Sequence, residues 1–135
     1  MPITTSWYDE DHRVVVQRYV GKYTWEEFSQ EAENTRTLAN SVPYNLVLLI
    51  DESQSNFMPS GNVLANGRSA MTGMPENYTQ VIVVIQSRLV EVFANLLFEM
   101  MPRYRSRMKI VKTVEEGEKL VAEAIAKNAV GSPVK

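Results

Sequence analysis

Two acidic residues follow a strongly apolar segment in the middle of the chain. Asp51 and Glu52 come directly after the run Leu-Val-Leu-Leu-Ile at 46–50. Three hydroxyl groups lie on the segment that follows, at Ser53, Ser55 and Ser60. Carboxylates at the carboxyl end of a buried strand are well placed for acid–base chemistry, because open α/β sheets place their ligands at that edge. A hydrolase would also need a base and an oxyanion site within reach of its nucleophile.

The only histidine of the chain, His12, lies far from this segment in the acidic turn 9–12. Neighbouring residues at a hairpin tip rarely converge on one ion, so this turn predicts solvated side chains and no metal site. The chain has no Gly-x-Ser-x-Gly elbow and no glycine-rich nucleotide loop. We therefore expect a protein that is not an enzyme and has no cofactor, and a hydrolase working from Asp51 and a loop serine is the third hypothesis.

The acidic pair needs a sheet to position it, and the apolar runs predict one. The run at 45–50 has no polar alternation, which indicates a central strand buried on both faces. A second such strand is expected within 78–85, a short last strand at 108–111, and an antiparallel hairpin from 3–8 and 13–20. Helices are expected to begin after Thr24 and Thr113, which have capping-box spacing, and over 62–72 and 88–101.

The bulk composition is that of one globular domain. The chain has 135 residues, of which 44% are apolar and 22% charged, so it can bury a core without disulfides, and it has no cysteine. A net charge of −2 gives no general attraction for nucleic acid. We expect the basic residues between 103 and 112 to form a solvated connector or a partner-facing rim. The segment 1–13 lacks the features of a secretory signal, which predicts a cytoplasmic protein without a membrane span.

Three stretches carry a resemblance to a known family: RVVVQRYVGKYTWEEF at 13–28, NLVLLIDESQSNFMPSGNVL at 45–64 and MKIVKTVEEGEKLV at 108–121. Together with the element order they resemble the STAS domain of bacterial anti-sigma-factor antagonists and SpoIIAA-like proteins. That order, predicted from the residues, is ββαβαβαβα with an opening antiparallel hairpin and later parallel strands. The resemblance implies a STAS-like α/β fold with a mixed sheet of about five strands and one domain over 1–130. The residues at 131–135 predict a flexible tail.

The resemblance also implies a function. Proteins of this family are regulatory and non-catalytic, and a partner kinase phosphorylates the serine that precedes a glycine at the start of the second helix. Ser60 and Gly61 match those positions. A phosphate would be favoured there because free amides and the helix dipole attract negative charge. The alternative is that Ser60 simply caps the helix.

The sequence therefore predicts a contact surface on the loop after the central strand and on the following helix. Its residues are Asp51, Phe57, Met58, Ser60, Gly61 and Asn62. The partner would be a protein such as a kinase or an anti-sigma-like regulator, and not a nucleic acid. The second hypothesis is a carrier of a small apolar ligand or lipid, because the apolar helix at 88–101 could line a cavity beside the sheet. The oligomeric state stays open, with a homodimer among the alternatives.

Overall fold

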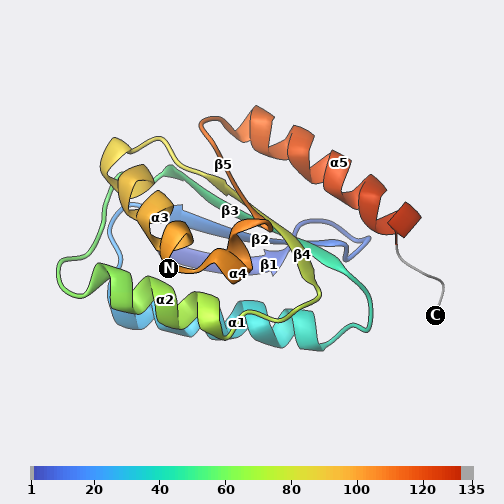
Figure 1. Cartoon of the computed structure of the whole chain (residues 1–135), viewed down its shortest axis with the longest axis horizontal. Helices are drawn as coiled ribbons and strands as arrows, with labels where there is room; N and C mark the ends of the chain where they lie inside the picture. The colour runs from blue at the N-terminus through green and yellow to red at the C-terminus, as the bar shows by residue number, and fades with distance from the viewer. Residues whose placement is uncertain (1, 132–135) are drawn as a thin grey trace.

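The computed structural model describes residues 2–131, which form a five-stranded sheet covered by helices (Figure 1). The strands are β1 (Ile3–Trp7), β2 (Val14–Val20), β3 (Leu46–Gln54), β4 (Tyr78–Val84) and β5 (Met108–Val111). The helices are α1 (Trp25–Asn40), α2 (Val63–Thr72), α3 (Arg88–Met100), α4 (Pro102–Arg105) and α5 (Val114–Gly131). Helix α5 thus includes Gly131, and the rest of the predicted tail, 132–135, lies outside the described residues.

The sheet has the predicted mixed α/β architecture. Its strand order is β1-β2-β3-β4-β5, with β1 and β2 antiparallel and every later pair parallel. Strand β3 is central, as the apolar run at 46–50 predicts, and pairs with β2 on one side and β4 on the other. The carboxyl ends of β2, β3 and β4 therefore lie at one edge of the sheet.

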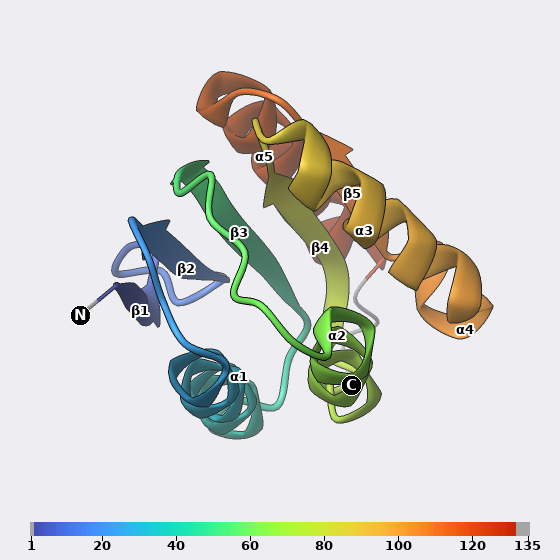
Figure 2. The ribbon, with the colours of Figure 1, turned by 90° about the vertical axis from the view of Figure 1, so that its left-hand side faces the viewer.

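The two faces of the sheet are covered differently (Figure 2). Alternate residues of each strand point to opposite faces, so Leu46 and Leu48 pack on one side and Val47 and Leu49 on the other. Helix α5 covers the second of these faces, which we call the α5 face. Helices α1, α2 and α3 cover the first, which we call the three-helix face.

Two local predictions are corrected by the structure. The strand expected to end at Ile50 continues to Gln54, because β2 also extends far enough to pair with it, through Val20 opposite Gln54. Ser60 is not a helix cap, since α2 begins at Val63 with Asn62 in the cap position. The expected basic connector contains the short helix α4, which starts with Pro102, a residue whose fixed φ suits a first helical turn.

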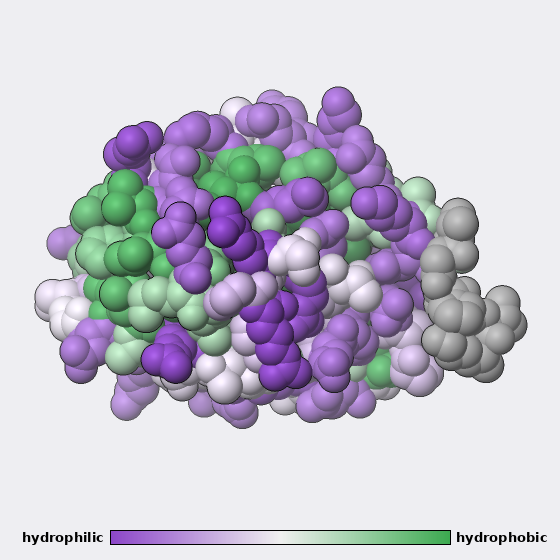
Figure 3. Space-filling view, viewed as in Figure 1, coloured by the Kyte–Doolittle hydropathy of each residue, from purple (hydrophilic) through white to green (hydrophobic). Residues whose placement is uncertain are grey.

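Helix α3 carries large apolar side chains on its outer side as well as on its buried side. Its outward large side chains are Leu89, Val92, Leu96 and Met100, which are 42–59% exposed. Figure 3 shows the resulting apolar surface over this part of the molecule, on the left. In the part of the chain that the structure describes, no helix is long and apolar enough to cross a bilayer.

Candidate functional site

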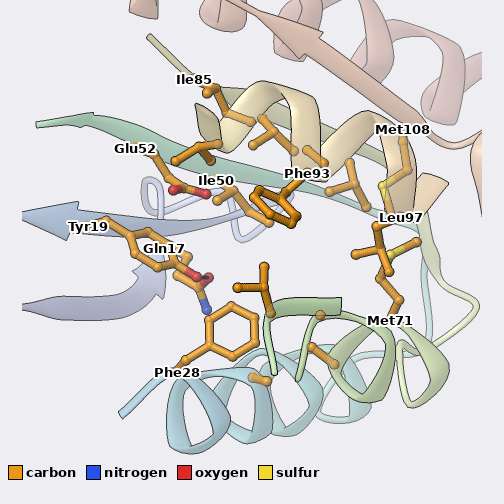
Figure 4. A pocket seen from close by; sticks show the side chains of 18 of the residues that line it. Gln17, Tyr19, Phe28, Ile50, Glu52, Met71, Ile85, Phe93, Leu97 and Met108 are labelled. Atoms are coloured by element: carbon orange, nitrogen blue, oxygen red, sulfur yellow. Dashed lines mark hydrogen bonds between the residues drawn. The ribbon is translucent and has the colours of Figure 1, made fainter. Parts of the chain in front are cut away.

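A cavity of about 170 Å³ lies between the sheet and the three helices α1, α2 and α3 (Figure 4). Most of its wall is apolar, with side chains such as Ile50 and Val83 from the sheet and Phe93 and Leu97 from α3. Protein interiors are normally close-packed, so a partly open pocket of this size among core side chains is a distinct feature of this face. The three-helix face therefore contains space that its own side chains do not fill.

Glu52 is the acidic residue that lines this cavity. Because side chains alternate along β3, Leu48, Ile50 and Glu52 all point to the three-helix face. The residue as a whole is half-buried, but its Oε1 atom is buried and accepts no hydrogen bond from any of residues 2–131. Burial, and secondarily the neighbouring charge of Asp51, raises the pKa of Glu52 to about 7.

The other polar groups at this end of the cavity satisfy one another. The Tyr19 hydroxyl donates to Gln17 Oε1 at 2.7 Å, and Gln17 Nε2 donates to the Glu31 carbonyl at 3.3 Å. Burial raises the pKa of the Tyr19 and Tyr23 phenols, and the Glu52 charge raises both further, so both stay protonated. The Glu52 side chain takes no part in these hydrogen bonds.

Aromatic rings surround the same end of the cavity. Tyr23 packs edge-to-face against Tyr19, with ring centroids 5.1 Å apart, and against Trp25 at 6.4 Å. Trp25 packs in the same way against Phe28 at 5.3 Å. In Figure 4, Tyr19, Gln17 and Glu52 lie at one end of the cavity, and Met71, Leu97 and Met108 lie at the other. The cavity therefore has a polar, aromatic end and a purely apolar end.

Asp51 points away from this cavity, although it adjoins Glu52 in the sequence. Its carboxylate lies 3.7 Å from the Arg18 guanidinium and accepts a hydrogen bond from the Ser53 amide at 2.9 Å. The two carboxylates that the sequence places side by side thus belong to opposite faces of the sheet. They do not form a convergent acid–base pair.

The residues of the predicted contact surface do not all lie at the surface. Met58 lines the cavity, and Phe57 packs against Tyr23 with centroids 5.8 Å apart, so neither presents a free apolar tip. Asp51, which was predicted to belong to this surface, is buried, whereas Ser60, Gly61 and Asn62 are exposed. This turn is anchored to α1, because Trp25 Nε1 donates to the Ser60 carbonyl at 2.9 Å, and the positive φ of 101° at Gly61 suits a glycine.

The remaining candidate groups are spread over the molecule. The Ser55 hydroxyl donates to the Gly21 carbonyl at 2.7 Å, which ties the end of β3 to the end of β2. His12 stacks on Trp7 with ring centroids 4.5 Å apart, at the hairpin end of the sheet. Within residues 2–131, no group of three histidine or acidic side chains could hold a metal ion.

No protein-family model matches the chain, and no curated protein matches it significantly. The resemblance to the STAS family therefore stays a prediction, and the site has to be interpreted from its own geometry.

Sequence reasoning treated Glu52 only as the companion of Asp51 and did not propose it as a binding residue. One signal could have separated the two. Glu52 continues the alternation of Leu48 and Ile50, whereas Asp51 continues that of Val47 and Leu49. In the same way, Gln17 lies two positions after Val15 on β2, which predicts that both side chains point to one face of the sheet.

Proposed function

We propose that this protein binds a small apolar molecule in the cavity between the sheet and helices α1, α2 and α3. The observation that carries the proposal is the cavity of about 170 Å³, with an apolar wall and one buried carboxyl group. Small-molecule sites are mostly apolar and contain a few polar groups that set the orientation of the ligand. This favours the second hypothesis from the sequence, the ligand carrier, over the interaction module.

The volume of the cavity limits the size of the ligand. An engineered apolar cavity of about 150 Å³ in another protein stays dry and binds benzene. A cavity of about 170 Å³ is thus matched to a ligand with one ring or a short alkyl chain. The small-ligand form of the carrier hypothesis therefore fits the volume better than a long-chain lipid does.

Titration with toluene, followed by calorimetry or by amide chemical shifts, tests this proposal. We expect saturable binding by the wild-type protein, because toluene matches the volume and polarity of the cavity. Ala94→Leu places extra atoms in the cavity wall and should abolish binding, and Ala70→Leu does the same from α2. Ala122→Leu is the matched control, since Ala122 is exposed on α5. The proposal fails if the folded wild type binds no toluene, or if the filled variants bind it as well as the control does.

A second candidate function is supported by the exposed turn at Ser60, Gly61 and Asn62. The turn is held in place by the hydrogen bond from Trp25, so it offers a preformed surface to a partner protein. The resemblance to SpoIIAA-like regulators suggests phosphorylation of Ser60 as the switch, through added charge and new hydrogen-bond acceptors.

Incubation with ATP and an extract of the native host, followed by intact-mass measurement, tests this second function. We expect one added phosphate on the wild type and none on Ser60→Ala. Equal phosphate incorporation into both proteins, or none into either, would remove Ser60 from the hypothesis.

A further inference from the structure

We propose that the ligand of this cavity is a small amphiphile with a protonated amine, and that Glu52 binds its ammonium group. The inference rests on the proposed function, because it requires that the cavity admits a ligand. It starts from one observation: Glu52 lines the cavity, and its buried Oε1 atom has no hydrogen-bond partner among residues 2–131. A buried acceptor of this kind is unfavourable unless a donor reaches it, and a bound ligand can supply that donor.

The charges around Glu52 show which donor is missing. No lysine, arginine or histidine of the described chain lines the cavity. The two phenols beside Glu52, Tyr19 and Tyr23, are neutral, and Asp51 contributes a negative charge from the next position. A carboxylate in an apolar site is stabilised most by a cation at short range, and an anionic ligand would add to the repulsion.

The two other charged groups nearby are already engaged elsewhere. On α1, the Glu31 carboxylate accepts hydrogen bonds from Thr5 at 2.6 Å and from Asn34 at 3.1 Å. On β2, Arg18 is paired with Asp51 on the α5 face and does not line the cavity. Glu31 is an anion like Glu52, and Arg18 could reach Glu52 only by leaving Asp51, so the complementary charge has to come from the ligand.

The aromatic rings favour the same ligand. Tyr19, Tyr23, Trp25 and Phe28 line the cavity together with Glu52. The faces of such rings attract cations, and aromatic cages that include a carboxylate suit ammonium groups better than neutral or anionic ones. The apolar end of the cavity, at Met71 and Leu97, would then hold the ring or short chain of the amine.

Three probes of one ring size test the inference: benzylamine, benzyl alcohol and benzoate. Each is titrated calorimetrically into the full chain at about pH 8, where Glu52 is ionised and the amine is protonated. We expect benzylamine to bind about tenfold more tightly than benzyl alcohol, because it makes a charge-assisted hydrogen bond. Benzoate should bind most weakly. Glu52→Gln should remove the preference for benzylamine while benzyl alcohol still binds, which shows that the variant is folded and its cavity open.

Asp51→Asn is the matched control, because it removes the adjacent carboxylate on the opposite face and should leave the preference in place. Lowering the pH to about 5.5 should weaken benzylamine several-fold, since protonated Glu52 no longer attracts the cation, and should leave benzyl alcohol unchanged. The inference is overturned if the toluene and benzyl alcohol titrations show binding but benzylamine has no advantage, or if benzoate binds best. Failure of all the probes, toluene included, would instead remove the proposed function.

Discussion

The two faces of the sheet are built from the same kinds of residues, yet a single helix covers one of them and a pocket lies under the helices on the other. On the α5 face, Ile82, Val84 and Val121 are at most 4% exposed, and a single long helix lies directly on the strands. The helix approaches so closely at Gly117 that an added Cβ atom would lie 2.9 Å from Val84 Cγ2. On the three-helix face, the cavity of about 170 Å³ remains between the strands and the helices.

The difference follows from how each face is covered. One helix can seat its small residues, Gly117 and Ala124, directly against the strands. Three helices that cover one face also have to pack against one another, so each of them is less free to settle onto the strands. The close approach of α5 is thus a property of one face, and the pocket lies on the other.

The largest effect on stability is expected from replacing one isoleucine on each face. Ile82 is fully buried on the α5 face, and Ile50 borders the cavity. We expect Ile82→Ala to reduce the free energy of unfolding by about 4 kcal/mol, because it opens a new cavity in a packed layer. Ile50→Ala should reduce it by about 2 kcal/mol, since fewer neighbouring atoms lose contact beside an existing void. Urea unfolding followed by circular dichroism measures both, and equal losses would mean that the two faces are equally well packed.

The second comparison uses the adjacent carboxylates. The Glu52 pKa of about 7, against an ordinary value of 4.5, means that the folded state holds this proton more tightly than the unfolded state does. The contribution of Glu52 to stability is therefore complete below about pH 4.5 and falls by about 3 kcal/mol as the pH rises through 7. Glu52→Gln should remove this loss, so that the variant is more stable than the wild type at about pH 8 and similar to it at about pH 4.

Asp51→Asn provides the contrast on the α5 face. Asp51 pairs with an Arg18 side chain that is half-exposed, and such pairs contribute about 1 kcal/mol or less. The variant should therefore be slightly less stable than the wild type near neutral pH. Urea unfolding curves of both variants and the wild type between about pH 4 and pH 8 measure these stability differences. A Glu52→Gln protein that is destabilised above pH 7 would show that the carboxylate has a partner in the folded chain.

The third comparison uses two helical glycines, one on each face. An added Cβ at Gly117 would meet the stiff, buried Val84 side chain, whereas at Gly67 it would meet Leu97 Cδ2 at 2.7 Å. Leu97 is flexible and borders the cavity, so it can move into free space. We expect Gly117→Ala to destabilise the protein by about 1–2 kcal/mol through overpacking. Gly67→Ala should be neutral, or stabilising by up to about 1 kcal/mol through helix propensity.

Thermal unfolding of the two glycine variants beside the wild type measures this difference. If Gly67→Ala is destabilised as much as Gly117→Ala, the space next to Leu97 is not available. In that case the cavity would be narrower than the structure indicates.

Most of the framework could be read from the sequence. The apolar runs at 46–50 and 81–85 predict two buried central strands, and the structure places them side by side. The capping-box spacing at Thr24 predicts the start of α1, where the hydroxyl and the Glu27 carboxylate make the reciprocal bonds. These features were predictable because they depend on local spacing and on the twofold period of strands.

The site could be predicted only in part, and the error concerned which face of the sheet each side chain points to. Sequence order put Asp51 and Glu52 together and grouped Asp51 with Met58 and Ser60, whereas the sheet sends Asp51 and Glu52 to opposite faces. The predicted cap at Ser60 failed for a related reason. The chain between Gln54 and Val63 is shaped by non-local contacts, from Gly21 to Ser55 and from Trp25 to Ser60, which no local pattern reveals.

The sequence by itself determined the strands and the central place of β3. Through the alternation from Leu48 to Glu52, it also determined which face of the sheet each of these side chains points to. Only the tertiary structure decided that α1, α2 and α3 leave a cavity beside Glu52, and that no donor of the described chain reaches its Oε1 atom. The physical reason is that periodicity is a property of neighbouring residues. Free volume and hydrogen-bond partners depend instead on how distant side chains fill one shared space.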